Sequence, residues 1–235
     1  MASIHYELLT PKYLDQACEV IRNALFIPGS LNEALGIPND PEALAELDLL
    51  SRATAKDGVS VIAVDKTNDK VAGVAFNKFW LKNDHFLENF ARTLKNSKSV
   101  DIIYMIINTE KLCDLFELLQ VDCVMEIFLL GTSNEYRRQG IAEKLCRFSV
   151  EVAQKLHNGV NVKQPVDGSP VTLEPVPQAV TAIFSSPVSQ RIGRKLGLQV
   201  AAEHDNSKVE LKDRVLEIPG ETTTTTLEYK KLVEG

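Results

Sequence analysis

The residues from Glu126 to Ala142 combine a favourable order of elements with side chains that suit anion binding. The apolar run Cys123–Leu130 has the length of a strand, and a charged, glycine-containing turn and an amphipathic helix follow it directly. The first N–H groups of a helix have no partners within the helix and carry a partial positive charge. A helix that begins near Gly140 can therefore hold a diphosphate on its backbone.

The side chains around this turn match that role. Gly140 lets the backbone approach an anion, and the small Ala142 keeps the next turn close. Arg137 and Arg138 supply charge-assisted hydrogen bonds. Two arginines at a helix start are more often a solvated surface, so the pattern gains its weight from its place between a strand and an amphipathic helix. A second strand–helix unit further along the chain adds to that weight.

Hydrophobic periodicity predicts a chain in which strands and helices are mixed. Strands are predicted at 4–9, 59–65, 71–80, 123–130, 179–184, 198–203 and over the last ten residues. Helices are predicted at 11–25, 40–56, 84–96, 100–120, 141–156 and 187–196. The turn residues between the second and third strands predict an antiparallel hairpin. Residues 157–178, rich in proline and without periodicity, predict an extended connection.

Composition narrows the class of protein. A length of 235 residues with 44% hydrophobic and 25% charged residues predicts one domain over 1–235. Lys and Arg total 26 against 32 Asp and Glu, so a nucleic-acid partner is not expected. No apolar run reaches membrane-spanning length and the first residues lack a secretory pattern, so we expect a cytoplasmic protein with no membrane partner.

The cysteines and histidines do not suggest a metal site. Cys18, Cys113, Cys123 and Cys146 lie in apolar stretches, and none has zinc-like spacing to another cysteine or to a histidine. We therefore predict no metal ligands and interpret the cysteines as reduced thiols of the core.

With these motifs, the sequence resembles the GCN5-related N-acetyltransferase superfamily. Its acetyl-CoA signature, Gln/Arg-x-x-Gly-x-Gly/Ala, is matched by Arg137-x-x-Gly140-x-Ala142. More narrowly, the sequence is similar to the insect arylalkylamine N-acetyltransferases and their polyamine-acetylating relatives. The segments that carry this likeness begin at Glu135 (Glu-Tyr-Arg-Arg-Gln-Gly-Ile-Ala) and at Ser185 (Ser-Ser-Pro-Val-Ser-Gln-Arg), in the family's order and spacing.

The resemblance implies an α/β (α+β) fold with acetyl-CoA as co-substrate. A mixed, mostly antiparallel sheet of about seven strands, flanked by helices on both faces, would splay between its fourth and fifth strands beside a bulge. Pantetheine would pair with the fourth strand from about Leu129 to Thr132, and the diphosphate would lie on the N–H groups of residues 138–142. The residues assigned to the coenzyme are Leu130, Thr132, Arg137, Arg138, Gln139, Gly140, Ile141 and Ala142.

An amine with a pKa of roughly 10.4 arrives protonated and needs a base. In the insect enzymes an Asp-Glu-Pro-Leu-Asn loop carries that base, but the corresponding stretch here has Gly29 in its place, and the nearest carboxylate is Glu33. Glu126 occupies the position of the base in histone-acetylating members. Alternation places Glu126 beside Val124 and Phe128 on a partly buried side, and we favour it over Glu33.

The resemblance also suggests donors for the departing thiolate. The tyrosine that many members carry is replaced by Gly193, whereas Ser185 and Ser189 match two serines implicated in the insect enzymes. The alternative for Ser189 is a hydroxyl that satisfies a helix start. The family histidine near the closing strand is absent, and His204, the nearest one, is a weak substitute whose alternative is an exposed turn residue.

The expected activity is direct acetyl transfer in a ternary complex to a small primary amine of arylalkylamine or polyamine type, by a monomer. Phe26, Phe79 and Trp80 are candidate walls of an aryl pocket, with the core as their ordinary place. Two alternatives stay open: a protein-lysine acetyltransferase, which an acidic groove would favour and a closed tunnel would not, and an acyl-CoA-binding sensor without catalysis.

Overall fold

The computed structural model describes residues 3–233. Its helices are α1 (Leu14–Ile21), α2 (Ser30–Leu35), α3 (Pro41–Ala55), α4 (Phe86–Thr93), α5 (Ser97–Glu110), α6 (Leu115–Leu119), α7 (Ile141–His157) and α8 (Pro187–Leu196). Its strands are β1 (Ile4–Leu8), β2 (Val61–Asp65), β3 (Lys70–Leu81), β4 (Cys123–Thr132), β5 (Ala179–Phe184), β6 (Gln199–Asp205), β7 (Lys208–Glu210), β8 (Val215–Glu217) and β9 (Thr224–Lys231). A π-helical turn, Arg22–Phe26, continues α1 directly.

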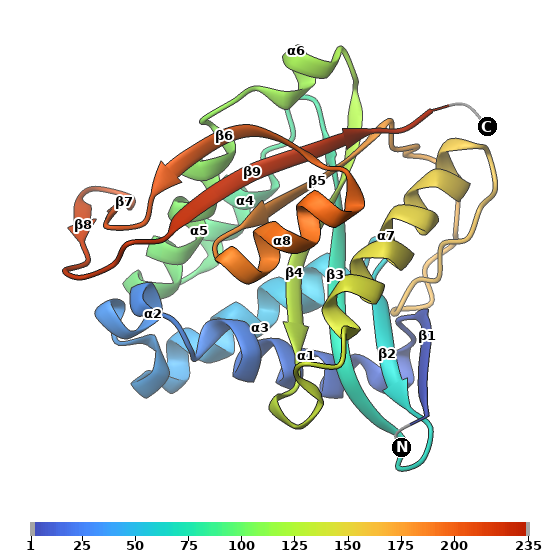
Figure 1. Cartoon of the computed structure of the whole chain (residues 1–235), viewed down its shortest axis with the longest axis horizontal. Coiled ribbons are helices and arrows are strands. Elements are labelled where there is room, and N and C mark those ends of the chain that lie inside the picture. Colours follow the sequence, from blue (N-terminus) through green and yellow to red (C-terminus); the bar gives the residue numbers. More distant parts are fainter. Residues whose placement is uncertain (1–2, 234–235) are drawn as a thin grey trace.

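The central sheet has seven strands in the order β1-β2-β3-β4-β5-β9-β6. Every neighbouring pair in it is antiparallel except β4 with β5, which is parallel (Figure 1). The long crossover between those two strands, which a parallel connection requires, contains helix α7. The mixed, mostly antiparallel sheet of about seven strands is thus confirmed.

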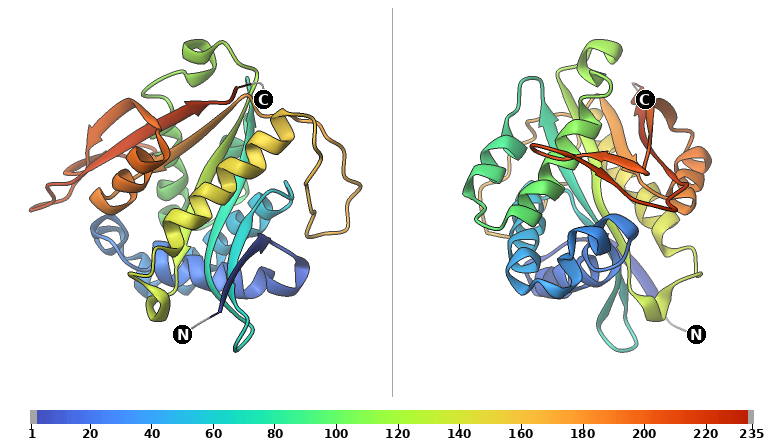
Figure 2. Two further views of the ribbon diagram at one scale, coloured as in Figure 1. Left: turned by 45° about the vertical axis from the view of Figure 1, so that its right-hand side comes forward. Right: turned by 90° about the vertical axis from the view of Figure 1, so that its left-hand side faces the viewer.

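Helices cover both faces of the sheet, and each face has its own core. Helices α1, α3, α4 and α5 pack on one face, against strand residues such as Val74 and Phe76. Helices α7 and α8 pack on the other, against residues such as Met125 and Ile127 (Figure 2). Alternation along the strands produces this division, because successive side chains point to opposite faces.

The sheet opens at the middle of β4. In the pairing with β3, Phe76 lies opposite Leu129 and Asn77 opposite Ile127, so Phe128 is an extra residue in a β-bulge. The ladder between β4 and β5 ends at the same level, with Ile127 opposite Ala182. Beyond the bulge, β4 therefore has a free edge on the β5 side, and the splay is confirmed.

Two short helices, α6 and α2, were not predicted: α6 lies where one continuous helix was expected, and α2 lies where a loop was expected. The helix predicted over 100–120 is interrupted after Glu110, because the Asp114 side chain accepts a hydrogen bond from the Glu117 N–H (3.0 Å) and starts α6. Helix α2 follows Gly29 and ends at Gly36 in the left-handed conformation, within a stretch without predicted structure.

The C-terminal region also differs from expectation. The closing strand was predicted over the last ten residues, whereas β9 begins at Thr224 and ends at Lys231; residues 234–235 lie outside the described part. The β7–β8 hairpin was not predicted. Residues 158–178 form an extended connection, as predicted, and Gln164 N–H donates to Gly58 O (2.8 Å). Between residues 3 and 233, no helix has the length and apolar character to span a bilayer.

Candidate active site

A basic cavity of about 820 Å³ lies where β4 leads into α7. Its walls come from the π-helical turn, the end of β4, the turn into α7 and one side of α8. The lining residues include Ala24, Leu130, Gly131, Thr132, Tyr136, Arg137, Arg138, Gly140, Ile141, Ala142, Glu143, Ser186, Val188, Arg191, Ile192 and Lys195. Of the residues predicted for the coenzyme, only Gln139 is not among them.

The backbone at the start of α7 presents free donors. Within residues 3–233, none of the N–H groups from Arg138 to Glu143 donates a hydrogen bond, and the first bond of the helix runs from Lys144 N–H to Gly140 O (3.2 Å). Arg138 and Gly140 both have positive φ angles, +62° and +73°. This conformation turns successive N–H groups to one side, as in anion-binding loops.

Four cationic side chains border the basic cavity, and two of them were not predicted from the sequence. Arg191 and Lys195 stand one turn apart on α8 and join Arg137 and Arg138. Of these four side chains, only Lys195 has an ion-pair partner among the described residues, and that partner is Glu143 (2.7 Å). The i, i+4 spacing of Arg191 and Lys195 was the available signal. The cavity is thus suited to a ligand with several negative charges.

The buried hydroxyl of Thr132 also indicates that the basic cavity binds a polar ligand. Its Oγ1 has no hydrogen-bond partner among the described residues, although the side chain lines the wall. Buried hydroxyls ordinarily find a partner, so this atom fits a site that is completed by a polar ligand.

An apolar cavity of about 400 Å³ lies on the other side of the bulge. Leu25 and Phe26 border it, whereas their neighbour Ala24 borders the basic cavity. Ser186 borders both, and the two cavities also take successive residues of β4. The β7–β8 hairpin and α2 cover the apolar cavity from outside, through Val209 and Leu31 among others. The two cavities therefore lie side by side along β4 and share a wall at Ser186, at the start of α8.

Glu126 is the buried carboxylate of the apolar cavity. It is 2% exposed, and its Oε2 accepts a hydrogen bond from the indole N–H of Trp80 while its Oε1 has no partner among the described residues. Burial raises the pKa of Glu126 to about 7, and the Trp80 bond opposes this only in part. A carboxylate with such a pKa can accept and release a proton at neutral pH.

A second carboxylate, Glu221, reaches the apolar cavity from the segment before β9. It accepts hydrogen bonds from the hydroxyl of Ser30 and from the N–H (2.9 Å) and hydroxyl (2.7 Å) of Thr223. These bonds lower the pKa of Glu221 to about 2, the Ser30 bond most of all. Sequence reasoning missed Glu221, because it contacts the Gly29 loop only through the fold.

Of the remaining candidate residues, two line the apolar cavity and two do not. Ser185 and His204 line the apolar cavity, and Thr109 Oγ1 lies 3.4 Å from His204 Nε2. Ser189 does not line the cavity: its Oγ bonds to Ser186 in the capping box that begins α8. Glu33 lies on the exposed side of α2, so the geometry gives it no contact with the cavity.

The three candidate aromatic residues do not share one cavity, because neighbouring side chains of β3 point to opposite faces of the sheet. Phe26 lines the apolar cavity, as predicted. Phe79 faces the core beneath α7, and Trp80 lies on the opposite face, where it borders a different cavity behind Glu126. The idea that all three wall one aryl pocket is therefore wrong. Cys113 is also only half-buried and borders that different cavity, whereas the other three cysteines are buried as predicted.

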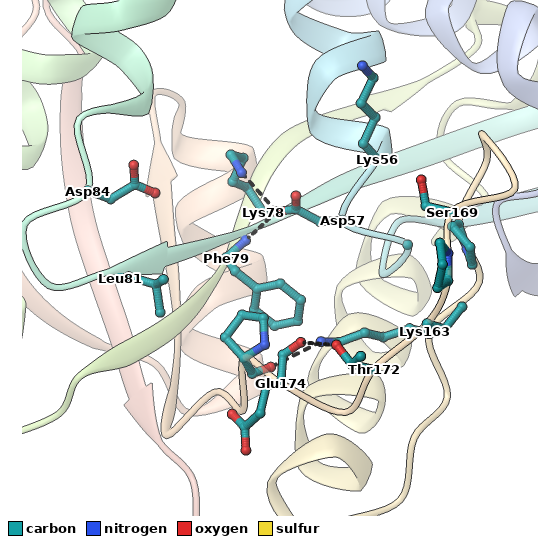
Figure 3. Close-up of a pocket in the computed structure, with 15 residues that line it drawn as sticks. Lys56, Asp57, Lys78, Phe79, Leu81, Asp84, Lys163, Ser169, Thr172 and Glu174 are labelled. Atoms are coloured by element: carbon teal, nitrogen blue, oxygen red, sulfur yellow. Dashed lines mark hydrogen bonds and ion pairs between the residues drawn. The ribbon is translucent and has the colours of Figure 1, made fainter.

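Another cavity, of about 290 Å³, lies where residues 158–178 cross the end of β3. It surrounds an ion pair between Lys78 Nζ and Asp57 Oδ2 (2.9 Å), and the same oxygen accepts the Phe79 N–H (Figure 3). Lys163 reaches in from the connection and lies 4.7 Å from the centre of the Phe79 ring. Of the residues predicted for the site, only the candidate aryl wall Phe79 lines this cavity, which we regard as separate from the active site.

Several solved structures have a similar architecture. Arylalkylamine N-acetyltransferase 2 from Aedes aegypti is 23% identical, with 98% of this chain and 100% of that chain covered at a TM-score of 0.75. A mosquito arylalkylamine N-acetyltransferase-like protein, 5b, is 17% identical (98% and 100% covered, TM-score 0.78). A polyamine N-acetyltransferase from Drosophila melanogaster, which forms N-acetylagmatine, is 14% identical (98% and 100% covered, TM-score 0.76). No model of a known family and no curated protein sequence matches.

The chain has the GCN5-related N-acetyltransferase fold. In this acetyltransferase fold the basic cavity and the free edge of β4 lie where the resemblance places the coenzyme. In the part of the chain between residues 3 and 233, no cluster of three potential metal ligands occurs.

Proposed function

We propose that this protein is an acetyl-CoA-dependent N-acetyltransferase that acetylates a small primary amine. One observation carries the proposal: the basic and apolar cavities share a wall at Ser186, and Glu126, a buried carboxylate with one oxygen unpartnered among the described residues, borders the apolar one. A diphosphate-bearing thioester on one side and an amine on the other would meet at that junction. The likeness to amine acetyltransferases supports the same activity.

In the proposed reaction Glu126 takes a proton from the ammonium, and the free amine attacks the thioester carbonyl. The raised pKa of Glu126 makes it a stronger base than an exposed glutamate at neutral pH. The thiol of coenzyme A, with a pKa of about 8.5, leaves readily and takes the second proton of the amine. The transfer is direct, in a ternary complex, because no cysteine lines either the basic or the apolar cavity.

The two carboxylates of the apolar cavity would have different tasks. Glu221, with its lowered pKa, stays ionised and suits the attraction of a cationic substrate. Glu126 suits proton transfer. Ser185 borders the same cavity and is our candidate donor to the departing thiolate. The choice between arylalkylamine and polyamine depends on how much of the apolar wall the substrate covers.

A small amine fits this site better than a protein lysine. The β7–β8 hairpin and α2 cover the apolar cavity, so an extended peptide would have to displace them. The acyl-CoA sensor is less well supported, because Glu126 provides the base that the Gly29 loop lacks. We further propose that residues 1–235 act as one domain, as a monomer and in the cytoplasm. Four cysteines without a disulfide suit that compartment.

The test measures coenzyme A release with panels of arylalkylamines, polyamines and a lysine peptide, beside calorimetry with coenzyme A. We expect wild type to bind coenzyme A and acetylate small amines. Glu126→Gln removes the base while keeping an acceptor for the Trp80 indole, so kcat/KM falls by about 10²–10⁴ at neutral pH. Acetylation of the amines recovers as pH rises toward their own pKa.

Two further variants assign the loss to a position. Glu117→Gln makes the same chemical change on an exposed part of α6 and retains full activity. Glu33→Gln tests the other candidate base, and a larger loss there than in Glu126→Gln transfers the role to the loop. If wild type binds coenzyme A but acetylates none of the amines, the sensor is the better description.

A further inference from the structure

Glu126 borders a third cavity as well as the apolar one. This acidic cavity has a volume of about 330 Å³ and lies between β3, β4, α4, α5 and the loop before α6. Its carboxylates are Asp84, Glu88, Glu110, Asp114 and Glu126, and Lys111 is its cationic residue. Glu126 therefore separates two compartments, one apolar and covered, the other rich in carboxylates.

Two carboxyl oxygens in the acidic cavity lack partners. Glu110 Oε1 and Glu126 Oε1 are both buried, and neither has a hydrogen-bond partner among the described residues. Buried polar atoms are ordinarily bonded to protein or to water, and a polar cavity of this size has room for several water molecules. The two glutamates thus suit connection through water across the cavity.

The two lysines near the pair, Lys78 and Lys111, each have another carboxylate partner. Lys78 stands opposite Glu126 in the β3–β4 ladder, and its ammonium is paired with Asp57 (Figure 3) and lies 5.3 Å from the centre of the Trp80 ring. Lys111 Nζ lies 4.0 Å from Glu88. The other titratable groups that face the pair are Asp84, Cys113 and Asp114 in the acidic cavity and His204 and Glu221 in the apolar one. Burial, the charge of Glu126, and then the charges of Glu88 and Asp84 raise the pKa of Glu110, and the charge of Lys111 opposes them only in part.

The proposed acetylation must also dispose of a proton. An ammonium and a thioester become an amide, a thiol and one free proton, so each turnover leaves one proton on Glu126. At that moment the amine and the coenzyme occupy the apolar and basic cavities. The acidic cavity is the compartment next to Glu126 that the two substrates leave open.

We propose that Glu110 receives this proton from Glu126 and releases it to solvent through the acidic cavity. In the first step the O–H bond of Glu126 breaks as an O–H bond forms on the carboxylate of Glu110, through intervening water. In the second step Glu110 loses the proton to solvent at the rim formed by Glu88 and Asp114. Glu126 returns to its ionised state, ready for the next amine. The inference rests on the proposed acetyltransferase function, and Glu110 acts in it as a positioning and relay residue.

Trp80 allows a test that does not depend on turnover. It is the single tryptophan of the chain, and its indole N–H bonds directly to Glu126, so its fluorescence reports the ionisation of that carboxyl. We expect a transition near neutral pH in wild type and none in Glu126→Gln. In Glu110→Gln the main step stays near neutral pH and the curve narrows to a one-proton transition, because the later ionisation of the coupled Glu110 no longer contributes. Glu117→Gln, on exposed α6, leaves the transition where it is.

Kinetics then separate a relay from other roles. In weak buffer, Glu110→Gln lowers kcat by about tenfold or more while KM for the amine stays the same. A small buffer acid–base pair such as imidazole restores kcat, since it carries the proton that Glu110 no longer carries. Glu88→Gln, at the rim, gives a smaller loss in the same direction.

Each alternative has its own outcome. If wild type acetylates amines but Glu110→Gln matches it in kcat and in the Trp80 transition, the relay is wrong. A rise in KM for diamines, with kcat unchanged, also overturns the relay and makes the cavity a site for a second ammonium. If wild type acetylates no amine, the proposed function fails, and an unchanged Trp80 transition in Glu110→Gln would separately show that the two carboxyls are not coupled.

Discussion

At the scale of single residues, the two serines of the β5–α8 junction have different surroundings. Ser185 faces the apolar cavity, whereas Ser189 completes the capping box of α8, with its Oγ 3.0 Å from Ser186 O. Ser186 Oγ in turn accepts the Ser189 N–H (3.2 Å). A hydroxyl committed to two backbone contacts at a helix start is a structural group before it is a catalytic one.

This difference predicts opposite effects of two alanine substitutions. Ser189→Ala loses capping and lowers the free energy of unfolding by about 1 kcal/mol, with little change in kcat. Ser185→Ala leaves the free energy of unfolding nearly unchanged and lowers kcat. Urea unfolding and steady-state kinetics on both variants measure the two effects. A large kcat loss in Ser189→Ala with a normal unfolding curve would give the catalytic role to Ser189.

The sequence was informative for site residues that lie within one continuous segment. Glu126 and the turn at Gly140 belong to one strand–turn–helix segment, so spacing alone placed them near each other. Glu221 and Glu110 come from distant segments and enter only through packing. No local pattern distinguishes either of them from an exposed glutamate, which is why neither was predicted.

At the scale of elements, the start of α7 depends on a close approach to β3. A Cβ on Gly73 would lie 2.9 Å from Ile141 Cγ2 and 3.1 Å from both Leu145 Cδ1 and Gly131 O. Gly73 therefore lets the first turn of α7 rest directly on the sheet, and this turn carries the free N–H groups of the basic cavity.

Gly73→Ala should accordingly displace the beginning of α7. The added methyl overpacks this contact, so we expect a loss of about 1–3 kcal/mol in the free energy of unfolding. We also expect weaker binding of coenzyme A, because the N–H groups of the turn move together with the helix. Urea unfolding and calorimetry measure the two effects. Unchanged coenzyme affinity would mean that the turn tolerates movement of α7.

Element prediction succeeded where periodicity and caps agreed. Asp40 accepts the Ala43 N–H (3.0 Å) at the start of α3, where the helix predicted over 40–56 begins. Prediction from the sequence failed for short elements that are stabilised by packing. Helix α2 has six residues and β7 and β8 have three each, too few for a period to emerge, and tertiary contacts stabilise them.

At the scale of the whole molecule, the buried glutamates make stability depend on pH. Burial raises the pKa of Glu126 from 4.5 to about 7, so between these values the folded protein retains a proton that the unfolded chain releases. The folded state therefore loses stability as pH rises through this window. Glu221 acts in the opposite sense: its lowered pKa contributes stability above the unfolded value, and this is lost as pH falls toward about 2.

Glu126→Gln should thus be more stable than wild type at pH 8 by about 3 kcal/mol and nearly equal to it at pH 4. The amide keeps an acceptor for the Trp80 indole and needs no ionisation. Urea unfolding of both proteins across this range gives the difference as a function of pH. A difference that does not vary with pH would mean that Glu126 titrates normally in the folded protein.

The bulge at Phe128 leaves an unpaired strand edge in the interior of the protein rather than at its rim. Edges at the rim invite other sheets, and proteins blunt or cover them. An interior edge is out of reach for a second sheet but accessible to a slender chain that brings its own amide groups. The same feature that interrupts the sheet therefore screens ligands by shape, and the pantetheine arm of coenzyme A, with two amides along a narrow chain, meets that requirement.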